Sequence, residues 1–196
     1  MAEPDPHPNH FVDVLKAPGG PQLEEEAWEC LGQAATIGEA IRVWSQAERF
    51  DSAFAATAWV LGMRRALIWG WRWLGQQPLE PETPAAALWG KVGRWLKQPP
   101  DHAERHEIHN QAQQLGIDHP IGLLAMAVFF SGGSLNTPDL DPVEPPPGVA
   151  LKMIAGAVRI ACVPGPPETV LERFRSAIEA GLALAQQPNP PVDSTG

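Results

Sequence analysis

The sequence has few cysteines, and this shortage narrows the class of protein. Its 196 residues include only Cys30 and Cys162, which stand far apart and form no C-x-x-C pair. A disulfide framework or a cysteine-based zinc site is therefore not indicated. We expect two free thiols in a reducing compartment and predict a cytoplasmic protein.

Basic residues and long apolar runs are also scarce. Fourteen Lys and Arg face 23 Asp and Glu, which gives a net charge of −9 and opposes binding to polyanions. The longest apolar runs, at 121–130 and 66–74, have about half the ~20 residues that span a bilayer. The first ten residues lack the basic and apolar regions of a signal peptide. We expect no export, no nucleic-acid partner and no membrane insertion.

Apolar residues recur at helical spacing in every periodic segment, and no segment has the alternation typical of a strand. The connections are mostly short, so consecutive helices should pack antiparallel. The sequence predicts a single all-α domain of about eight helices over residues 10–186, because a chain of this length can bury a core of its own. Residues 1–9 and 187–196 are predicted to be disordered tails.

One stretch breaks the helical pattern. The apolar run at 121–130 ends at Ser131-Gly132-Gly133-Ser134, where glycine allows a left-handed helix cap. Prolines then fix φ and remove backbone donors, which predicts an extended strap until a helix starts near residue 149. The prolines are Pro138, Pro142, Pro145, Pro146 and Pro147. Between them stand three apolar residues that we expect to pack on the helices beneath: Leu135, Leu140 and Val143.

The strap carries a resemblance. Its pattern S-G-G-S-L-x-x-P-D-L-x-x-V-x-P-P-P-G, followed by I-A-G-A-V at 154–158, is similar to an uncharacterised bacterial all-helical family of unknown function. The segment Arg65-Ala66-Leu67-Ile68-Trp69 fits the same family, and the similarity runs from about residue 38 to 185. Members usually place tryptophan where Phe130 stands here. The resemblance implies an accessory or adaptor role, because genes of this family are often found beside type VI secretion components.

Residues 64–76 are the richest in tryptophan, with Trp69 and Trp73 on one side of the predicted helix and Trp71 on the other. This indicates a central helix, with Arg65 placed to lie over an indole. The alternatives are an exposed tryptophan that anchors a protein interface and, less favoured, an aromatic ligand pocket. The candidate structural or interface residues are Arg65, Trp69, Trp71, Trp73, Ser131, Gly132, Gly133, Ser134, Leu135, Pro138 and Leu140.

Two patterns raise catalytic hypotheses. His102, His106 and His109 share one face of a predicted helix, at a spacing that can chelate a metal, but that face should be largely exposed to solvent. Ser131 and Ser134 flank the glycine turn, yet this turn follows a helix, whereas a nucleophile elbow follows a strand. We therefore predict no catalytic residue, no metal site and no cofactor.

The function expected from these patterns is a non-catalytic cytoplasmic adaptor or chaperone that binds another protein. The resemblance adds a secretion component or effector of the type VI system as the partner. Two alternatives stay open at this point: an immunity protein that neutralises a toxin, and a metal-dependent or serine hydrolase.

Overall fold

The computed structural model describes residues 10–16, 19–32, 34–98, 102–137 and 139–188. These residues form nine α-helices and one 3-10 helix, and no strand occurs among them, which confirms the predicted all-α class. The elements are α1 (His10–Lys16), α2 (Glu25–Glu29), α3 (Ile37–Gln46), α4 (Phe50–Gly75), α5 (Pro84–Lys97), α6 (His102–Leu115), α7 (Pro120–Phe129), α8 (Val149–Ala161), η1 (Pro167–Thr169) and α9 (Val170–Ala185). The tails predicted to be disordered lie almost wholly outside these ranges.

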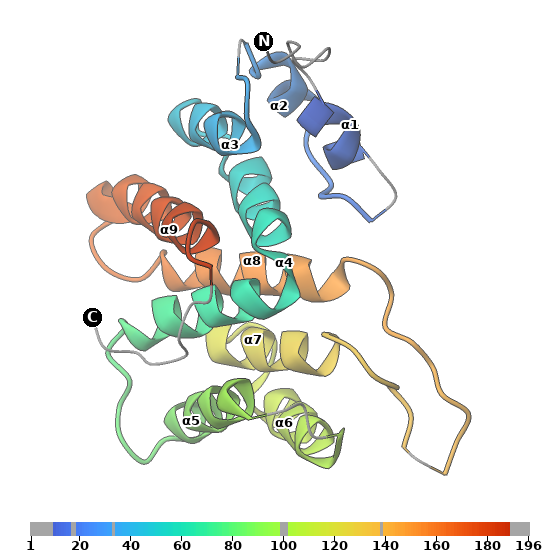
Figure 1. Ribbon diagram of the computed structural model, residues 1–196. Coiled ribbons are helices and arrows are strands. Elements are labelled where there is room, and N and C mark those ends of the chain that lie inside the picture. Colours follow the sequence, from blue (N-terminus) through green and yellow to red (C-terminus); the bar gives the residue numbers. More distant parts are fainter. Residues whose placement is uncertain (1–9, 17–18, 33, 99–101, 138, 189–196) are drawn as a thin grey trace.

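Helix α4 is the longest element and bends at Gly62. Gly62 has φ 67° and ψ 166°, a backbone conformation that only glycine adopts without strain. Figure 1 shows the two halves of α4 running in clearly different directions. The bend lets the single helix contribute to both halves of the molecule.

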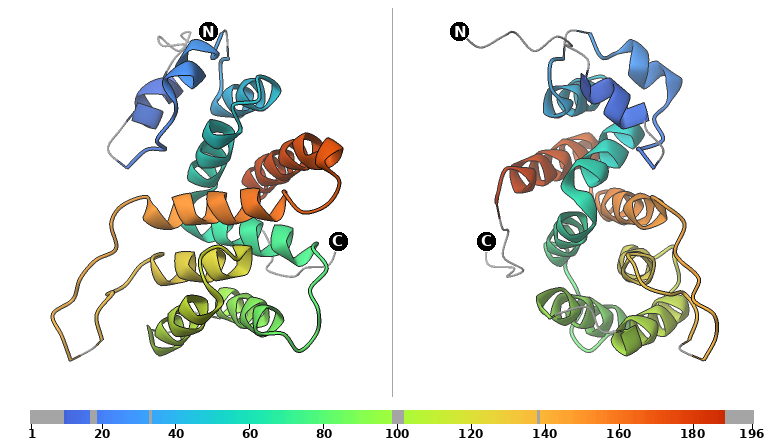
Figure 2. Two further views of the ribbon diagram at one scale, coloured as in Figure 1. Left: turned by 180° about the vertical axis from the view of Figure 1, so that it is seen from behind. Right: turned by 45° about the vertical axis from the view of Figure 1, so that its right-hand side comes forward.

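The helices pack around α4 and α8. Helix α8 packs against both α4 and α7, and α5 and α6 cover another side of α7 (Figures 1 and 2). Helices α3 and α9 cover the first half of α4. The core at these contacts is apolar and fully buried, as at Ile68, Leu124 and Ile154. No helix in the described ranges is long and apolar enough to cross a membrane.

Candidate functional site

The strap, residues 131–148, joins α7 to α8 and projects from the helical body (Figures 1 and 2). It begins at a tight turn, in which the Ser131 hydroxyl donates a hydrogen bond to the Val128 carbonyl at 2.8 Å. Gly133 follows with φ 70°, in the left-handed region. The turn is thus a helix end, as the sequence predicted, and it points the chain away from the core.

Arg105 on α6 anchors this turn. The side chain is only 4% exposed, and its guanidinium donates to the carbonyls of Phe129 and Ser134, both at 2.5 Å. Its Nη2 also lies 3.0 Å from His102 Nδ1. A Cβ on Gly133 would lie 3.0 Å from that same Nη2, so glycine is needed here for space as well as for its backbone. Burial lowers the pKa of Arg105, but an arginine side chain stays charged in a protein.

Hydrogen bonds within the strap hold it as a closed loop. The Ser134 hydroxyl oxygen accepts from the backbone N–H of Asn136 at 3.0 Å and of Val143 at 3.2 Å. The Leu135 N–H donates to the Val143 carbonyl at 2.8 Å, and the Asn136 side-chain amide donates to the Asp141 carbonyl at 2.6 Å. The two arms of the strap are therefore held together by its own hydrogen bonds.

The apolar residues of the strap do not act as predicted. Leu140 is 58% exposed and Val143 47% exposed, so neither packs on a helix, and only Leu135 is half-buried. The prediction failed because polar groups of the strap itself, above all Ser134, supply the contacts that fix its shape. Pro138, also predicted as part of this site, lies outside the described residues.

The three histidines are half-buried rather than largely exposed. His109 stacks on the Phe129 ring with centroids 3.9 Å apart, and His106 meets the edge of the same ring at 5.1 Å. Nε2 of His106 is buried and has no hydrogen-bond partner within the part of the chain that the structure describes. Burial lowers the pKa of His106, and the neighbouring His102 and Arg105 charges lower it further. Among the described residues no group of three His, Cys, Asp or Glu side chains is placed to hold a metal ion.

Two of the predicted tryptophans tie helices together in the core. Trp69 is 2% exposed and donates to the Ala177 carbonyl of α9 at 2.9 Å. Trp73 is 8% exposed, and its Nε1 donates to Cys162 Sγ at 3.2 Å. Burial raises the pKa of the Cys162 thiol to about 11. Both indoles are structural residues, because a partner could not reach them without unpacking the core.

Arg65 has a structural role different from the predicted contact with an indole. Its guanidinium donates to the carbonyl of Ala185, the last residue of α9, at 3.3 Å, and to that of Pro188 at 2.9 Å. Carbonyls at a helix C-terminus lack partners within the helix, so Arg65 caps α9 and holds the residues that follow.

Trp71 forms a reciprocal lock with Trp89 of α5. Each indole N–H donates to the other residue's backbone carbonyl at 3.0 Å, and the rings stack with centroids 4.8 Å apart. Gly75 and Gly93, each four residues after one of the tryptophans, leave room for the opposite ring. A Cβ on either glycine would come within 2.6 Å of that ring. The repeated spacing W-x-x-x-G could have revealed this lock in the sequence.

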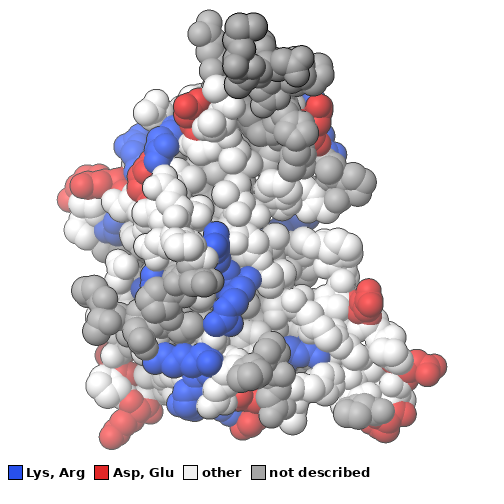
Figure 3. Space-filling view, viewed as in Figure 1, with Lys and Arg blue, Asp and Glu red and all other residues white. Residues whose placement is uncertain are grey.

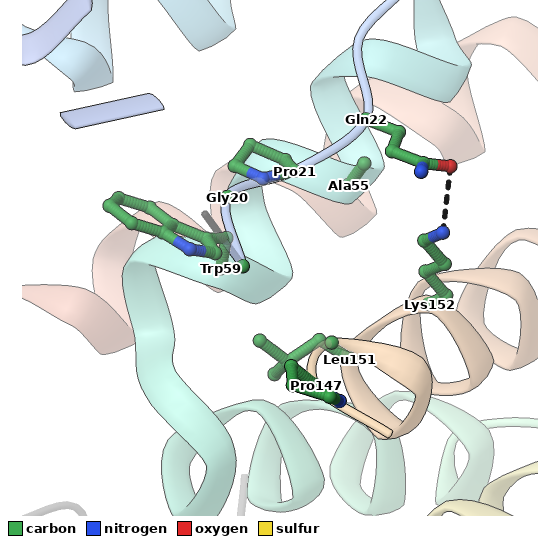
Figure 4. Close-up of a pocket in the computed structure, with 10 residues that line it drawn as sticks. Gly20, Pro21, Gln22, Ala55, Trp59, Pro147, Leu151 and Lys152 are labelled. Atoms are coloured by element: carbon green, nitrogen blue, oxygen red, sulfur yellow. Dashed lines mark hydrogen bonds between the residues drawn. The ribbon is translucent and has the colours of Figure 1, made fainter. Parts of the chain in front are cut away.

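Two clefts meet at the base of the strap. One, of about 460 Å³, lies between the strap and the body and is floored by Met63, Phe130 and Ala150. The other, of about 350 Å³, lies between residues 19–22, α4 and the start of α8, and both are bordered by residues 147–148. Figure 4 shows Trp59 on one side of the second cleft and Leu151 on the other, with Lys152 donating to Gln22 at 2.7 Å. The lining is mostly apolar and backbone, which suits shape-based contact better than acid–base chemistry.

The fold and the site together define a small helical domain that presents a preformed, proline-rich loop. The chain belongs to a family of unknown function (DUF6931), whose model matches residues 40–185, including the strap and all of α4 to α9. No curated protein matches the chain, and no solved structure does.

Proposed function

We propose that this protein is a non-catalytic protein-binding module, an adaptor or chaperone-like protein, and that its partner contacts the strap. The observation that carries this proposal is the exposure of Leu140 and Val143 on a loop that is already closed by its own hydrogen bonds. Ordering a flexible loop opposes binding, so a loop held in shape beforehand binds more tightly for the same contacts.

The anchoring of the strap supports the same proposal. The buried guanidinium of Arg105 donates hydrogen bonds to two backbone carbonyls at the start of the strap. In the part of the chain that the structure describes, no carboxylate is paired with it. A buried charge without a counter-charge is costly and needs good hydrogen bonds. The burial of Arg105 fixes the position of the strap at a cost in free energy, which is expected where that position matters for function.

The partner class follows from the resemblance of the strap pattern. We propose a component or an effector of a type VI secretion system, met in the cytoplasm before secretion. This part of the proposal rests on the resemblance alone and is tested separately from the binding surface.

The two serines of the turn offer a matched test. Ser134→Ala removes the acceptor of two strap N–H groups, whereas Ser131→Ala removes only a bond to the preceding turn of α7. Tagged full-length proteins would be isolated from the cells that make them, and the bound proteins identified by mass spectrometry. We expect a partner that is recovered with wild type and Ser131→Ala but depleted with Ser134→Ala and with Leu140→Ser.

Recovery of the same proteins with Leu140→Ser would contradict the strap as the binding surface. A strap-dependent partner unrelated to secretion would leave the binding module standing and remove the type VI assignment.

A further inference from the structure

The charged residues of the strap are all acidic, and this indicates the chemistry of the partner surface. Residues 131–148 contain Asp139, Asp141 and Glu144 and no lysine or arginine. All three acidic residues are exposed. A hydrogen bond from the Thr137 side chain lowers the pKa of Asp139, which keeps this carboxylate ionised.

The acidic residues alternate with the exposed apolar ones. The order is Asp139-Leu140-Asp141-Pro142-Val143-Glu144, so Leu140 stands between two aspartates and Val143 stands next to a glutamate. Figure 3 shows Lys and Arg gathered over the middle of the face in view, while at its outer edge, on the strap's side, the charged atoms belong to Asp and Glu. The tip of the strap is therefore both apolar and locally negative.

We infer that the tip of the strap, residues 139–144, docks into an apolar pocket rimmed by lysine and arginine on the partner protein. This inference rests on the proposed function and specifies its partner by chemistry. Burial of Leu140 and Val143 supplies affinity, since apolar anchors in a desolvated pocket dominate binding. The three carboxylates orient the strap and speed association, because charged rims act mainly on encounter and specificity.

Site-specific photocrosslinking in the cells that make the protein tests this. The full-length chain would carry p-benzoylphenylalanine in place of Leu140, and a control chain would carry it in place of Ile117, which is equally exposed at 57% but lies between α6 and α7. The crosslinked peptide on the partner would then be mapped. We expect a crosslink from position 140 only, to a site whose neighbourhood is apolar and carries several Lys and Arg.

Binding of the purified partner, once it is identified in this way, provides the second readout. Asp139→Asn with Asp141→Asn should slow association by about tenfold at low salt and flatten its salt dependence. Leu140→Ser should weaken binding by at least about tenfold with the salt dependence unchanged.

The outcomes separate the two proposals. A crosslink from position 140 to a partner surface without Lys or Arg, or to a second copy of this chain, overturns the inferred chemistry but leaves a strap that binds protein. Equal crosslinking from positions 140 and 117, or none from position 140, overturns the proposed function and this inference together.

Discussion

Two glycines of α5, three residues apart, should respond in opposite directions to the same substitution. A Cβ on Gly93 would lie 2.6 Å from Trp71 Cζ2 and 2.8 Å from its Cε2. A Cβ on Gly90 would meet nothing closer than the Arg94 guanidinium, at 3.7 Å. Both glycines lie inside the same helix, so replacing either one by alanine gains the same intrinsic helix propensity.

The magnitudes follow from these contacts. Alanine in place of glycine inside a helix stabilises by about 0.5–1 kcal/mol, and this is the whole effect expected of Gly90→Ala. Gly93→Ala gains the same amount but forces a rigid, hydrogen-bonded indole aside, and such overpacking costs about 1–3 kcal/mol. Displacing Trp71 also weakens its two reciprocal hydrogen bonds with Trp89, at roughly 0.5–1.5 kcal/mol each. We expect the two variants to differ by about 2–4 kcal/mol in the free energy of unfolding.

Urea unfolding followed by circular dichroism at 222 nm measures this difference without relying on tryptophan fluorescence, which the mutation itself would change. In thermal melts the two variants should differ on the order of 5–15 °C for a chain of this size. If Gly93→Ala proved as stable as Gly90→Ala, the packing of α5 on α4 described here would be wrong.

Three further predictions concern buried polar groups. Arg105→Met should lower the free energy of unfolding in urea by about 2–4 kcal/mol, because two carbonyls lose their charged hydrogen-bond donor. The same substitution at the exposed Arg64 should change it by no more than about 0.5 kcal/mol. Equal effects of the two substitutions would contradict the role of Arg105 as the anchor of the strap. Burial raises the pKa of the Cys162 thiol to about 11, so only about one part in a thousand is thiolate at pH 8. A disulfide reagent should therefore modify the half-buried Cys30 first and reach Cys162 only on unfolding. Modification of both thiols at the same rate would refute the burial of Cys162. Burial holds the pKa of His106 below its unfolded value, so the stability that the neutral imidazole contributes is complete above about pH 6.5 and is lost as the pH falls towards the folded pKa. The urea midpoint should therefore drop between pH 7 and 5, and it should drop less in His106→Gln. An equal drop in His106→Gln would show that another group causes the pH dependence.

Local pattern was sufficient to predict the helices but not the faces that they bury. The break of α4 at Gly62 and the end of α7 at the glycine turn both follow from backbone preferences that act within a few residues. The prediction that the face carrying His106 and His109 is exposed assumes a helix buried on one side only. Helix α6 instead packs on both α5 and α7, so the side that carries these histidines is covered by Phe129.

The anchor of the strap could not be predicted from the sequence. Arg105 binds carbonyls 24 and 29 residues further along the chain, and backbone carbonyls carry no residue-specific signal. An arginine on a largely polar helix is normally exposed. The predicted contacts of Leu140 and Val143 failed for a related reason: apolar composition alone does not say whether a residue between prolines faces the core or the solvent.

The proposed function requires the strap to be an ordered loop in the free protein. Amide hydrogen exchange at Leu135, Asn136 and Val143, measured by NMR on the isolated full-length chain, tests this directly. These three N–H groups donate within the strap, and we predict that they exchange about 10- to 100-fold more slowly than in an unstructured peptide. Exchange of all three at the unstructured rate would contradict a preformed strap.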